Sequence, residues 1–500
     1  MQPGGERSAA VAAIVVIMWG VAALAILTAF GLAGPAQALP SFARQTGQPC
    51  GTCHTDFPAL TPFGRSFKLR GYTAGGGQFR RTPFDFDYAA AAEVLAQYTG
   101  MPVKAPPAII GSTSDIWVPP VAVMAVVGLT HTQAPLSEPT APFQPNDNIF
   151  PSPVSVFYGG AITDHIGAFQ QITFAGPGPG APGPFDHNWT WDNTDVRYSN
   201  TGRFGGLDFV WGITANNNPS VQDVWNTTPA WKFPFAVSTL APTPSAATLI
   251  DGGFAAHVVG AGPYAWVNDL VYLEASAYKT LDFRTQNNLG VNPFGAPGLI
   301  DGAAPYFRFA VEPHWGNHSL EFGTFGLLAR VAPWLTSING STASLTDKYT
   351  DIGVDSQYQY QGNNYWFTVR GSYIHESQRL DASLFLGNAA NLHNELNTLR
   401  AEASLAYGAD NRIVATAQYF TTWGSIDPFF FAGSLGTGIP NSNGYVFELA
   451  YMPFGMSKAP LWPWLNARIG AQYIYYNEFD GDRVHAHDNN TFFLYAWLAM

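Results

Sequence analysis

The two cysteines of this 500-residue chain lie in one short motif, Cys50-Gly51-Thr52-Cys53-His54. Two thiols at this spacing suit addition to the two vinyl groups of a haem, and the adjacent histidine suits an axial position on the iron. The motif therefore predicts one covalently bound haem c. Cys50 and Cys53 are the expected thioether residues, and His54 is the expected proximal ligand.

Two other chemistries use a Cys-x-x-Cys pair, and the rest of the sequence argues against both. A zinc site of this type needs further thiolates, and the chain has no third cysteine. A thioredoxin-like dithiol needs a βαβ context, which the sequence does not indicate. The sequence also gives no support to hydrolases, because it shows neither a nucleophile elbow nor a His-Glu-x-x-His motif.

The N-terminus has the pattern of an export signal. Residues 1–10 are polar and include Arg7, residues 11–33 are almost wholly apolar, and Ala36-Gln37-Ala38 fits a small-residue cleavage site. The pattern predicts a signal peptide over residues 1–38. The apolar run is also long enough to span a bilayer as an uncleaved anchor. Both alternatives place the cysteine motif outside the cytoplasm, where covalent haem attachment takes place.

The composition is unlike that of a soluble protein. Only 12% of the residues are charged and 15% are aromatic, and the chain contains 51 glycines and 38 prolines. Soluble domains carry about 25% charged residues. Few charges and many aromatic residues, without a second long apolar run, are typical of a transmembrane β-barrel. The net charge of −12 argues against nucleic acid as a partner and favours cations near the surface.

Residues 118–500 are interpreted as an all-β outer-membrane barrel of about 16 antiparallel strands. From Trp117 onwards, segments with period-2 alternation are separated by connections of alternately short and long length, as in bacterial barrels. A soluble β-sandwich gives no reason for this alternation. Residues 492–500 are the expected closing strand. Short turns are predicted at 163–165, 200–203, 262–263, 315–317, 361–364 and 408–412. Long loops are predicted at about 133–152, 177–187, 215–250, 282–302, 332–346, 378–396, 425–441 and 478–489.

The residues before the barrel form two segments. Residues 39–80 contain the haem motif and a predicted helix over residues 63–70, which Thr61 and Pro62 start and Gly71 ends. This unit is too small to bury a haem alone, so we expect it to dock in the lumen or at the periplasmic mouth. Residues 81–117 are a connecting or plug segment, with a possible helix over 88–98.

Several stretches of the sequence resemble a known family. Residues 39–47, 50–54, 63–68, 217–219 and 220–231 look like parts of the outer-membrane porin–cytochrome c fusions associated with extracellular iron oxidation. The resemblance implies a monohaem, 16-stranded protein that oxidises extracellular Fe(II). It also implies that the electron passes inward to a periplasmic carrier, either a cytochrome or a cupredoxin. Residues 84–117 look like an insertion relative to that family.

The second axial ligand of the haem is not evident from the sequence. Residues 39–80 contain no other His and no Met. The candidates are Met101, Met124 and His131, and a less usual ligand or an open position are further alternatives. A methionine ligand would favour a high reduction potential.

One predicted outer loop has ligands suited to Fe(II). Residues 477–490 include Asp480, Asp482, His485 and His487, and carboxylate with imidazole is a ligand set that suits Fe(II). This loop is a candidate docking site for the donor. The simpler alternative is a solvated loop at the barrel rim.

Three functions remain open from the sequence alone. The first is an electron conduit that oxidises extracellular Fe(II). The second is a passive porin whose haem-bearing plug is structural or acts as a gate. The third is a conduit for other extracellular donors or acceptors.

Overall fold

The computed structural model describes residues 40–73, 120–136, 143–174, 188–333, 345–408, 410–432, 436–457 and 461–500. The predicted signal peptide over residues 1–38 and the predicted helix over 88–98 lie outside the described residues. So does Met101. None of the helices in the described part of the chain is long and apolar enough to cross a membrane.

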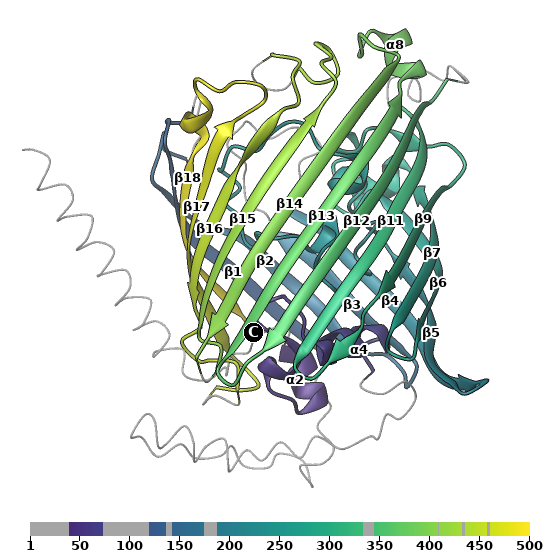
Figure 1. The fold of residues 1–500 in the computed structure, drawn as a ribbon. Coiled ribbons are helices and arrows are strands. Elements are labelled where there is room, and N and C mark those ends of the chain that lie inside the picture. The colour runs from purple at the N-terminus through teal and green to yellow at the C-terminus, as the bar shows by residue number, and fades with distance from the viewer. Residues whose placement is uncertain are drawn as a thin grey trace, which may run out of the picture.

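One antiparallel sheet closes on itself to form a barrel (Figure 1). Two of its strands, β8 (Leu299–Ile300) and β10 (His314–Trp315), are two residues long, and the other sixteen follow one another around the wall. The last strand pairs with the first, so that Leu494 lies opposite Leu129. The predicted fold of about 16 antiparallel strands is therefore confirmed. The long strands are β1 (Val121–Thr132), β2 (Asn148–Ala161), β3 (Ile166–Phe174), β4 (Trp189–Phe204), β5 (Leu207–Asn216), β6 (Val258–Val267), β7 (Val271–Thr280), β9 (Ala304–Val311), β11 (His318–Ala332), β12 (Asp347–Gln361), β13 (Tyr365–Arg379), β14 (His393–Tyr407), β15 (Ile413–Gly424), β16 (Ser442–Tyr451), β17 (Asn466–Glu478) and β18 (Thr491–Ala499).

The two ends of the barrel differ in the length of their connections. The end that we call the short-turn mouth carries the turns after β2, β4, β6, β9, β12 and β14, together with the longer connection 452–465. The opposite end, the long-loop mouth, carries the long connections and helix α8 (Asp381–Leu386) at the top of Figure 1. The predicted alternation of short and long connections is confirmed.

Two predicted turns are misplaced. Gly262 and Pro263 lie inside β6, opposite Thr214 and Ile213, and not in a turn. The turn lies at 268–270, where Asn268 and Asp269 both have a φ of 52°. The dipeptide Gly-Pro is a common turn signal, but here it interrupts the β6–β7 ladder within the strand. The turn predicted at 200–203 lies at 205–206, because two glycines with positive φ close that hairpin.

The wall has the opposite polarity to that of a soluble protein. In β12, the carboxylates of Asp351 and Asp355 face the lumen and are buried, whereas Ile352 and Val354 face outward and are 41% and 51% exposed. Other strands follow the same rule. Outward-facing side chains with large exposed fractions include Ile213, Leu273, Phe322, Leu405, Phe447 and Leu449. Such alternation matches a barrel with an apolar outer face and a polar interior.

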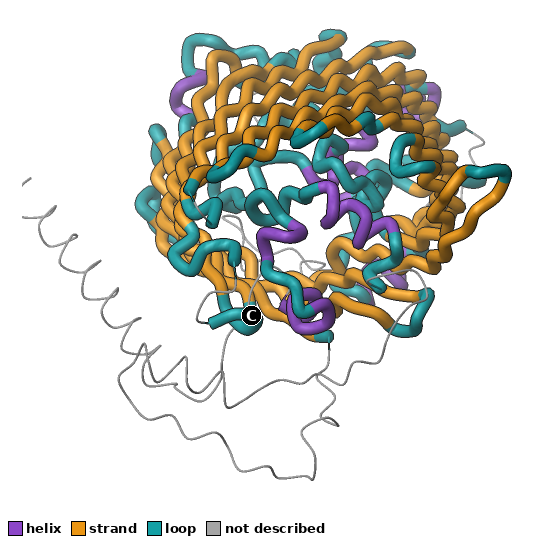
Figure 2. The backbone as a smooth tube through the Cα atoms, turned by 60° about the horizontal axis from the view of Figure 1, so that its bottom comes forward, coloured by secondary structure: helices purple, strands orange, loops and turns teal. Residues whose placement is uncertain are grey.

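Two segments occupy the lumen, and Figure 2 shows their helices and loops inside the ring of strands. The N-terminal segment (residues 40–73) contains α2 (Pro40–Thr46), α3 (Cys50–Cys53) and α4 (Pro62–Leu69). The inserted loop (residues 217–257), between β5 and β6, contains the short helical turns Pro229–Trp231 and Leu249–Gly253. The predicted helix over residues 63–70 is confirmed to within one residue at each end.

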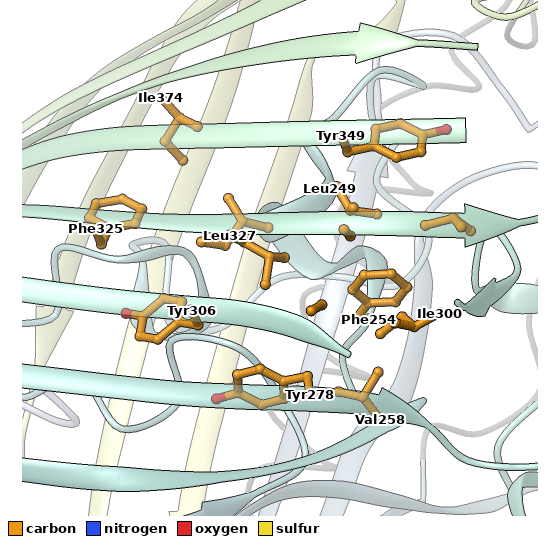
Figure 3. Close-up of a cluster of buried hydrophobic side chains, with 14 of the residues drawn as sticks. Leu249, Phe254, Val258, Tyr278, Ile300, Tyr306, Phe325, Leu327, Tyr349 and Ile374 are labelled. Atoms are coloured by element: carbon orange, nitrogen blue, oxygen red, sulfur yellow. The ribbon is translucent and has the colours of Figure 1, made fainter. Parts of the chain in front are cut away.

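The inserted loop contributes its own small core against the wall. Leu249, Ile250 and Phe254 pack against buried side chains of neighbouring strands (Figure 3). Those wall residues are Tyr278, Tyr306, Phe325, Leu327, Tyr349 and Ile374. The other elements of the described chain are α6 (Phe283–Asn288) and the turns Pro293–Gly295 and Ala486–Asn489 in the long loops.

Candidate functional site

The cysteine motif forms one turn of helix, and α4 packs directly on it. The amide of His54 donates to the carbonyl of Cys50 at 2.9 Å, and the amide of Thr61 donates to the carbonyl of Cys53 at 2.9 Å. The hydroxyl of Thr61 accepts from the Gly64 amide, which caps α4, and donates to the Thr52 carbonyl at 2.6 Å. One threonine therefore ties the start of α4 to the motif.

Gly64 makes this close packing possible. A Cβ atom at this position would lie 2.1 Å from the carbonyl oxygen of Cys53. Any side chain larger than hydrogen would push α4 away from the motif. The close contact between Gly64 and the Cys53 carbonyl thus fixes the distance between the cysteine motif and α4.

The two cysteines are not joined by a disulfide and lie in an apolar environment. Burial raises the pKa of Cys50 to about 11. Burial, and secondarily the neighbouring Cys50, raises the pKa of Cys53 to about 12. Reactive dithiols and zinc ligands need thiolates, which low-pKa environments favour. The surroundings of this pair therefore oppose both of the alternative chemistries.

His54 is oriented by the backbone that follows it. Its Nδ1 lies 3.3 Å from the carbonyl oxygen of Pro58, and its ring packs against Phe57 with centroids 5.4 Å apart. Since a carbonyl can only accept, Nδ1 carries the proton and Nε2 keeps its lone pair. Burial lowers the pKa of His54 to about 4, so the ring is neutral at pH 7. A neutral imidazole with a fixed tautomer is suited to bind a metal.

These three residues line one cavity of about 460 Å³ inside the barrel. Its walls come from the N-terminal segment, the inserted loop, the first strands β1–β4 and the last strands β17 and β18. Most of the lining is aromatic or aliphatic, and includes Phe42, Phe57, Phe67, Phe157, Phe169, Trp231, Phe235 and Trp497. Cofactor sites of this kind have volumes of about 300–1,000 Å³ and few polar groups. In volume and lining, the cavity fits a haem attached to Cys50 and Cys53.

Three basic side chains also line the cavity. The Nζ of Lys68 donates to the carbonyls of Val221 and Asp223, both at 2.8 Å, and lies 4.6 Å from the centre of the Trp231 ring. Lys232 pairs with Asp251, and Arg468 pairs with Asp56 at 2.8 Å. Burial, with a smaller contribution from Arg197, lowers the pKa of Lys68 to about 7. Each of these basic groups is thus bound by acceptors of the protein around the cavity.

Charged contacts hold the N-terminal segment against the wall. The Arg65 guanidinium pairs with Glu312 and donates to Gln359 Oε1 at 2.7 Å and to Ser319 Oγ at 2.9 Å. The Tyr72 hydroxyl donates to Asp195 at 2.7 Å, on another part of the barrel. The cavity therefore lies between the N-terminal segment and a barrel wall to which these contacts hold that segment.

The structure distinguishes between two of the predicted candidates for the second axial ligand, Met124 and His131. Met124 lines the cavity together with the cysteines and His54. His131 is on the same strand but belongs to the outward-facing set, and its Nδ1 lies 2.8 Å from Asp147 on the exposed surface. Met124 and His131 are an odd number of residues apart on β1, so their side chains lie on opposite faces of the strand.

The predicted Fe(II)-docking residues are not brought together. Asp480 is buried, and its carboxylate accepts from the amide of Ser245 at 3.0 Å. Asp482 and His485 form an exposed pair at 3.0 Å, and His487 lies beside Asp488 at 3.5 Å. Within the described ranges, no group of three or more His, Cys, Asp or Glu side chains is placed to hold a metal ion. Asp480 instead secures the inserted loop.

Comparisons with known proteins give matches among solved structures. No protein-family model matches the chain, and no curated protein matches it in sequence. Among solved structures it is similar to the outer membrane channel DcaP of Acinetobacter baumannii, with 13% identity and a TM-score of 0.43. That match covers 76% of this chain and 96% of the channel.

Two further solved structures are similar to this chain to about the same degree. One is OprB of Pseudomonas putida, with 13% identity, a TM-score of 0.41, and coverage of 76% of this chain and 92% of OprB. The other is OmpT of Vibrio cholerae, an outer membrane protein, with 9% identity, a TM-score of 0.38, and coverage of 76% and 96%.

Proposed function

We propose that this chain is an outer-membrane electron conduit that carries one covalent haem c inside a 16-stranded barrel. The observation that carries the proposal is the position of Cys50, Cys53 and His54 on a single apolar cavity within the barrel. A passive pore has no need of a thiol pair and a neutral imidazole at such a place.

The polarity of the wall supports the membrane location. Outward-facing residues are apolar and exposed, as at Phe322 and Leu449, while buried carboxylates and guanidinium groups face inward. An even number of strands with alternating short and long connections is the pattern of bacterial outer-membrane barrels. In those barrels the short turns face the periplasm, so the short-turn mouth would face the periplasm and lipid would cover the outer wall.

The residues around the cavity have separate roles in holding the cofactor. Cys50 and Cys53 would form the thioethers, and His54 would bind the iron through Nε2. The haem supplies one-electron chemistry when it is bound. Thr61 and Gly64 hold the motif against α4, the Pro58 carbonyl fixes the His54 tautomer, and the aromatic lining excludes water.

The position of the motif suits electron transfer on the periplasmic side. Gly51 and Thr52, between the two cysteines, line an open groove of about 590 Å³ with the turn residues 361–364 at the short-turn mouth. A periplasmic cytochrome or cupredoxin could approach the motif there. The opposite mouth would face the donor, for which we propose extracellular Fe(II) on the basis of the sequence resemblance. Oxidation outside the cell keeps poorly soluble Fe(III) hydroxide out of the periplasm.

The test uses the full-length protein produced in a bacterium that matures c-type cytochromes. We expect outer-membrane fractions to contain haem that stays bound after denaturation. Substituting Cys50→Ala with Cys53→Ala should abolish this haem, whereas an exposed control, Arg203→Met, should retain it. Fe(II) added to intact cells should reduce the haem, as seen by absorbance.

Two outcomes would contradict the proposal. A wild-type protein without covalent haem would leave only the passive porin, which planar-bilayer conductance would then reveal. A haem that Fe(II) does not reduce, but that another extracellular donor reduces or an extracellular acceptor oxidises, would retain the conduit and reject iron as its donor.

A further inference from the structure

The cavity contains few side chains that can bind iron besides His54. Apart from the cysteines, the described lining residues with suitable groups are Met124, Lys68, Lys232, Tyr72 and Asp223. A second axial ligand has to come from this set or from a residue outside the described ranges. The surroundings of each side chain distinguish between them.

Four of the five have strong interactions elsewhere. The Asp223 carboxylate pairs with Arg308 at 3.3 Å and accepts from the Trp225 amide at 3.2 Å. Lys68 donates to two carbonyls at 2.8 Å and covers the face of Trp231. Lys232 pairs with the buried carboxylate of Asp251, and the Tyr72 hydroxyl donates to Asp195 at 2.7 Å. Moving any of them to an iron atom would leave a buried partner without its hydrogen bond, which is unfavourable.

Binding to iron would not take Met124 away from a hydrogen-bonding partner of this kind. Its side chain belongs to the inward-facing set of β1, with Ala122 and Val126 on the same face. It packs on an aromatic cluster that includes Phe67, Phe157 and Phe169. A thioether is a weak acceptor and needs no hydrogen bond when buried. Its unbranched side chain can adjust to a ligand position at small cost.

The residues beside Met124 in the sheet are small. It lies opposite Ser155 on β2 and opposite Ala499 on β18. Met124 is therefore the long side chain in this row of the wall, next to the cavity. No neighbouring side chain in the row blocks its approach.

Met124 and the cysteine motif belong to different walls of the cavity. Cys50 packs with Ala406, Val414 and Ala450, which lie on β14, β15 and β16. Met124 lies on β1. This arrangement offers the iron one ligand from the N-terminal segment and a second from the barrel itself.

From these contacts we propose that the Met124 sulfur is the second axial ligand of the haem iron. The proposal rests on the proposed function, because it requires a haem at Cys50 and Cys53. The sulfur donates a lone pair to the iron, and no bond in the protein breaks. A Met–His ligand pair raises the reduction potential. The bond would also join the N-terminal segment to the first strand.

The experiment compares the purified wild-type protein with Met124→Leu, Met124→His and the control Met452→Leu. Met452 is a buried methionine that packs near Cys50 but does not line the cavity. The ferric wild-type and control proteins should show the weak red charge-transfer band of methionine-bound haem. Met124→Leu should lose this band, gain rapid binding of carbon monoxide when reduced, and show a lower midpoint potential.

The remaining outcomes separate the two proposals. Met124→His should give a low-spin spectrum without the band, which also covers the case in which Met124→Leu fails to fold. Covalent haem without the band in the wild type, or with the band in Met124→Leu, overturns the Met124 ligand and leaves the conduit standing. A wild-type protein without covalent haem overturns the conduit itself.

Discussion

The N-terminal segment and residues 233–250 of the inserted loop are held in different ways. The N-terminal segment uses its own charged side chains, chiefly Arg65 with Glu312 and Asp56 with Arg468. Residues 233–250 of the inserted loop use backbone groups, which are bound by side chains of the wall. The Phe233 carbonyl accepts from Gln418 at 3.0 Å, and the Leu249 amide donates to Glu376 at 2.5 Å.

The molecule thus shows two ways of holding a segment without regular secondary structure inside a barrel. Backbone groups in a closed lumen have to be satisfied whatever the local sequence is, so polar wall residues can place a loop without special side chains on the loop. The N-terminal segment depends on a few specific charges instead. Each of them should therefore have a larger effect on substitution than a wall residue that holds only a backbone group of residues 233–250.

The largest effect is expected for Arg65→Met. It leaves the buried Glu312 carboxylate without its cation, and breaking a buried pair in this way costs about 3–5 kcal/mol. Proteolysis of the detergent-folded protein should release the N-terminal segment much faster than in wild type. The control is Arg203→Met, whose pair with Asp208 is exposed and should contribute at most about 1 kcal/mol. Equal protease sensitivity of the two variants would contradict the comparison.

A smaller effect is expected for Gly64→Ala. The added Cβ would meet the Cys53 carbonyl oxygen at 2.1 Å, and such overpacking costs about 1–3 kcal/mol. Since α4 has to move from the cysteine motif, covalent haem per molecule of protein should fall. Gly371→Ala is the matched control, because its new Cβ would meet no atom closer than 3.6 Å. Unchanged haem content in Gly64→Ala would show that the close contact is dispensable.

Removing a wall residue that holds the inserted loop should cost less. Gln418→Leu removes one donor from the Phe233 carbonyl, and a hydrogen bond of this kind contributes about 1 kcal/mol. Other backbone groups of the loop, at Ala236, Leu249 and Ile250, keep their partners. The temperature at which the folded band disappears on gels should change little. A loss as large as that of Arg65→Met would reject the distinction between the two segments.

The smallest effect is a pH dependence at the contact between the two segments. Lys68 has a folded-state pKa of about 7 because of burial, against 10.5 for an exposed lysine. The unfolded chain therefore binds more protons between these values, and docking becomes more stable as the pH rises above 7. Because Lys68 is already half deprotonated in the folded state at pH 7, the gain from pH 7 to 8 is at most about 1 kcal/mol.

The measurement for this contact is the pH dependence of segment release by protease. Wild-type protein should become more resistant from pH 7 to 8, and Lys68→Met should show a weaker dependence. The same slope in both proteins would mean that another group titrates.

Local sequence patterns predict the parts of this molecule that local interactions determine. Strand alternation and loop length gave the correct strand number, and Thr61 and Gly71 predicted both ends of α4. The Gly262-Pro263 turn failed because the pairing of β6 with β5 continues through it. Local signals do not report such pairing, which depends on residues far away in the chain.

The candidate site shows the same limit. The cysteine motif and His54 follow from spacing alone and remain predictions for haem binding. Arg468, Lys232 and Trp231 were not predicted as parts of the cavity, because their partners lie far away in sequence. The alternation of the strand that contains Arg468 would have placed it in the lumen. For Asp480, a cluster of acidic residues suggested metal binding, whereas the structure uses the carboxylate to hold the inserted loop.

The pairing of β1 with β18 has a consequence for assembly. Met124 on one side of this seam and Trp497 and Ala499 on the other all line the cavity. The cavity is therefore incomplete until the two ends of the sheet have met. The pairing that closes the barrel therefore also completes the wall of the pocket that Cys50, Cys53 and His54 line.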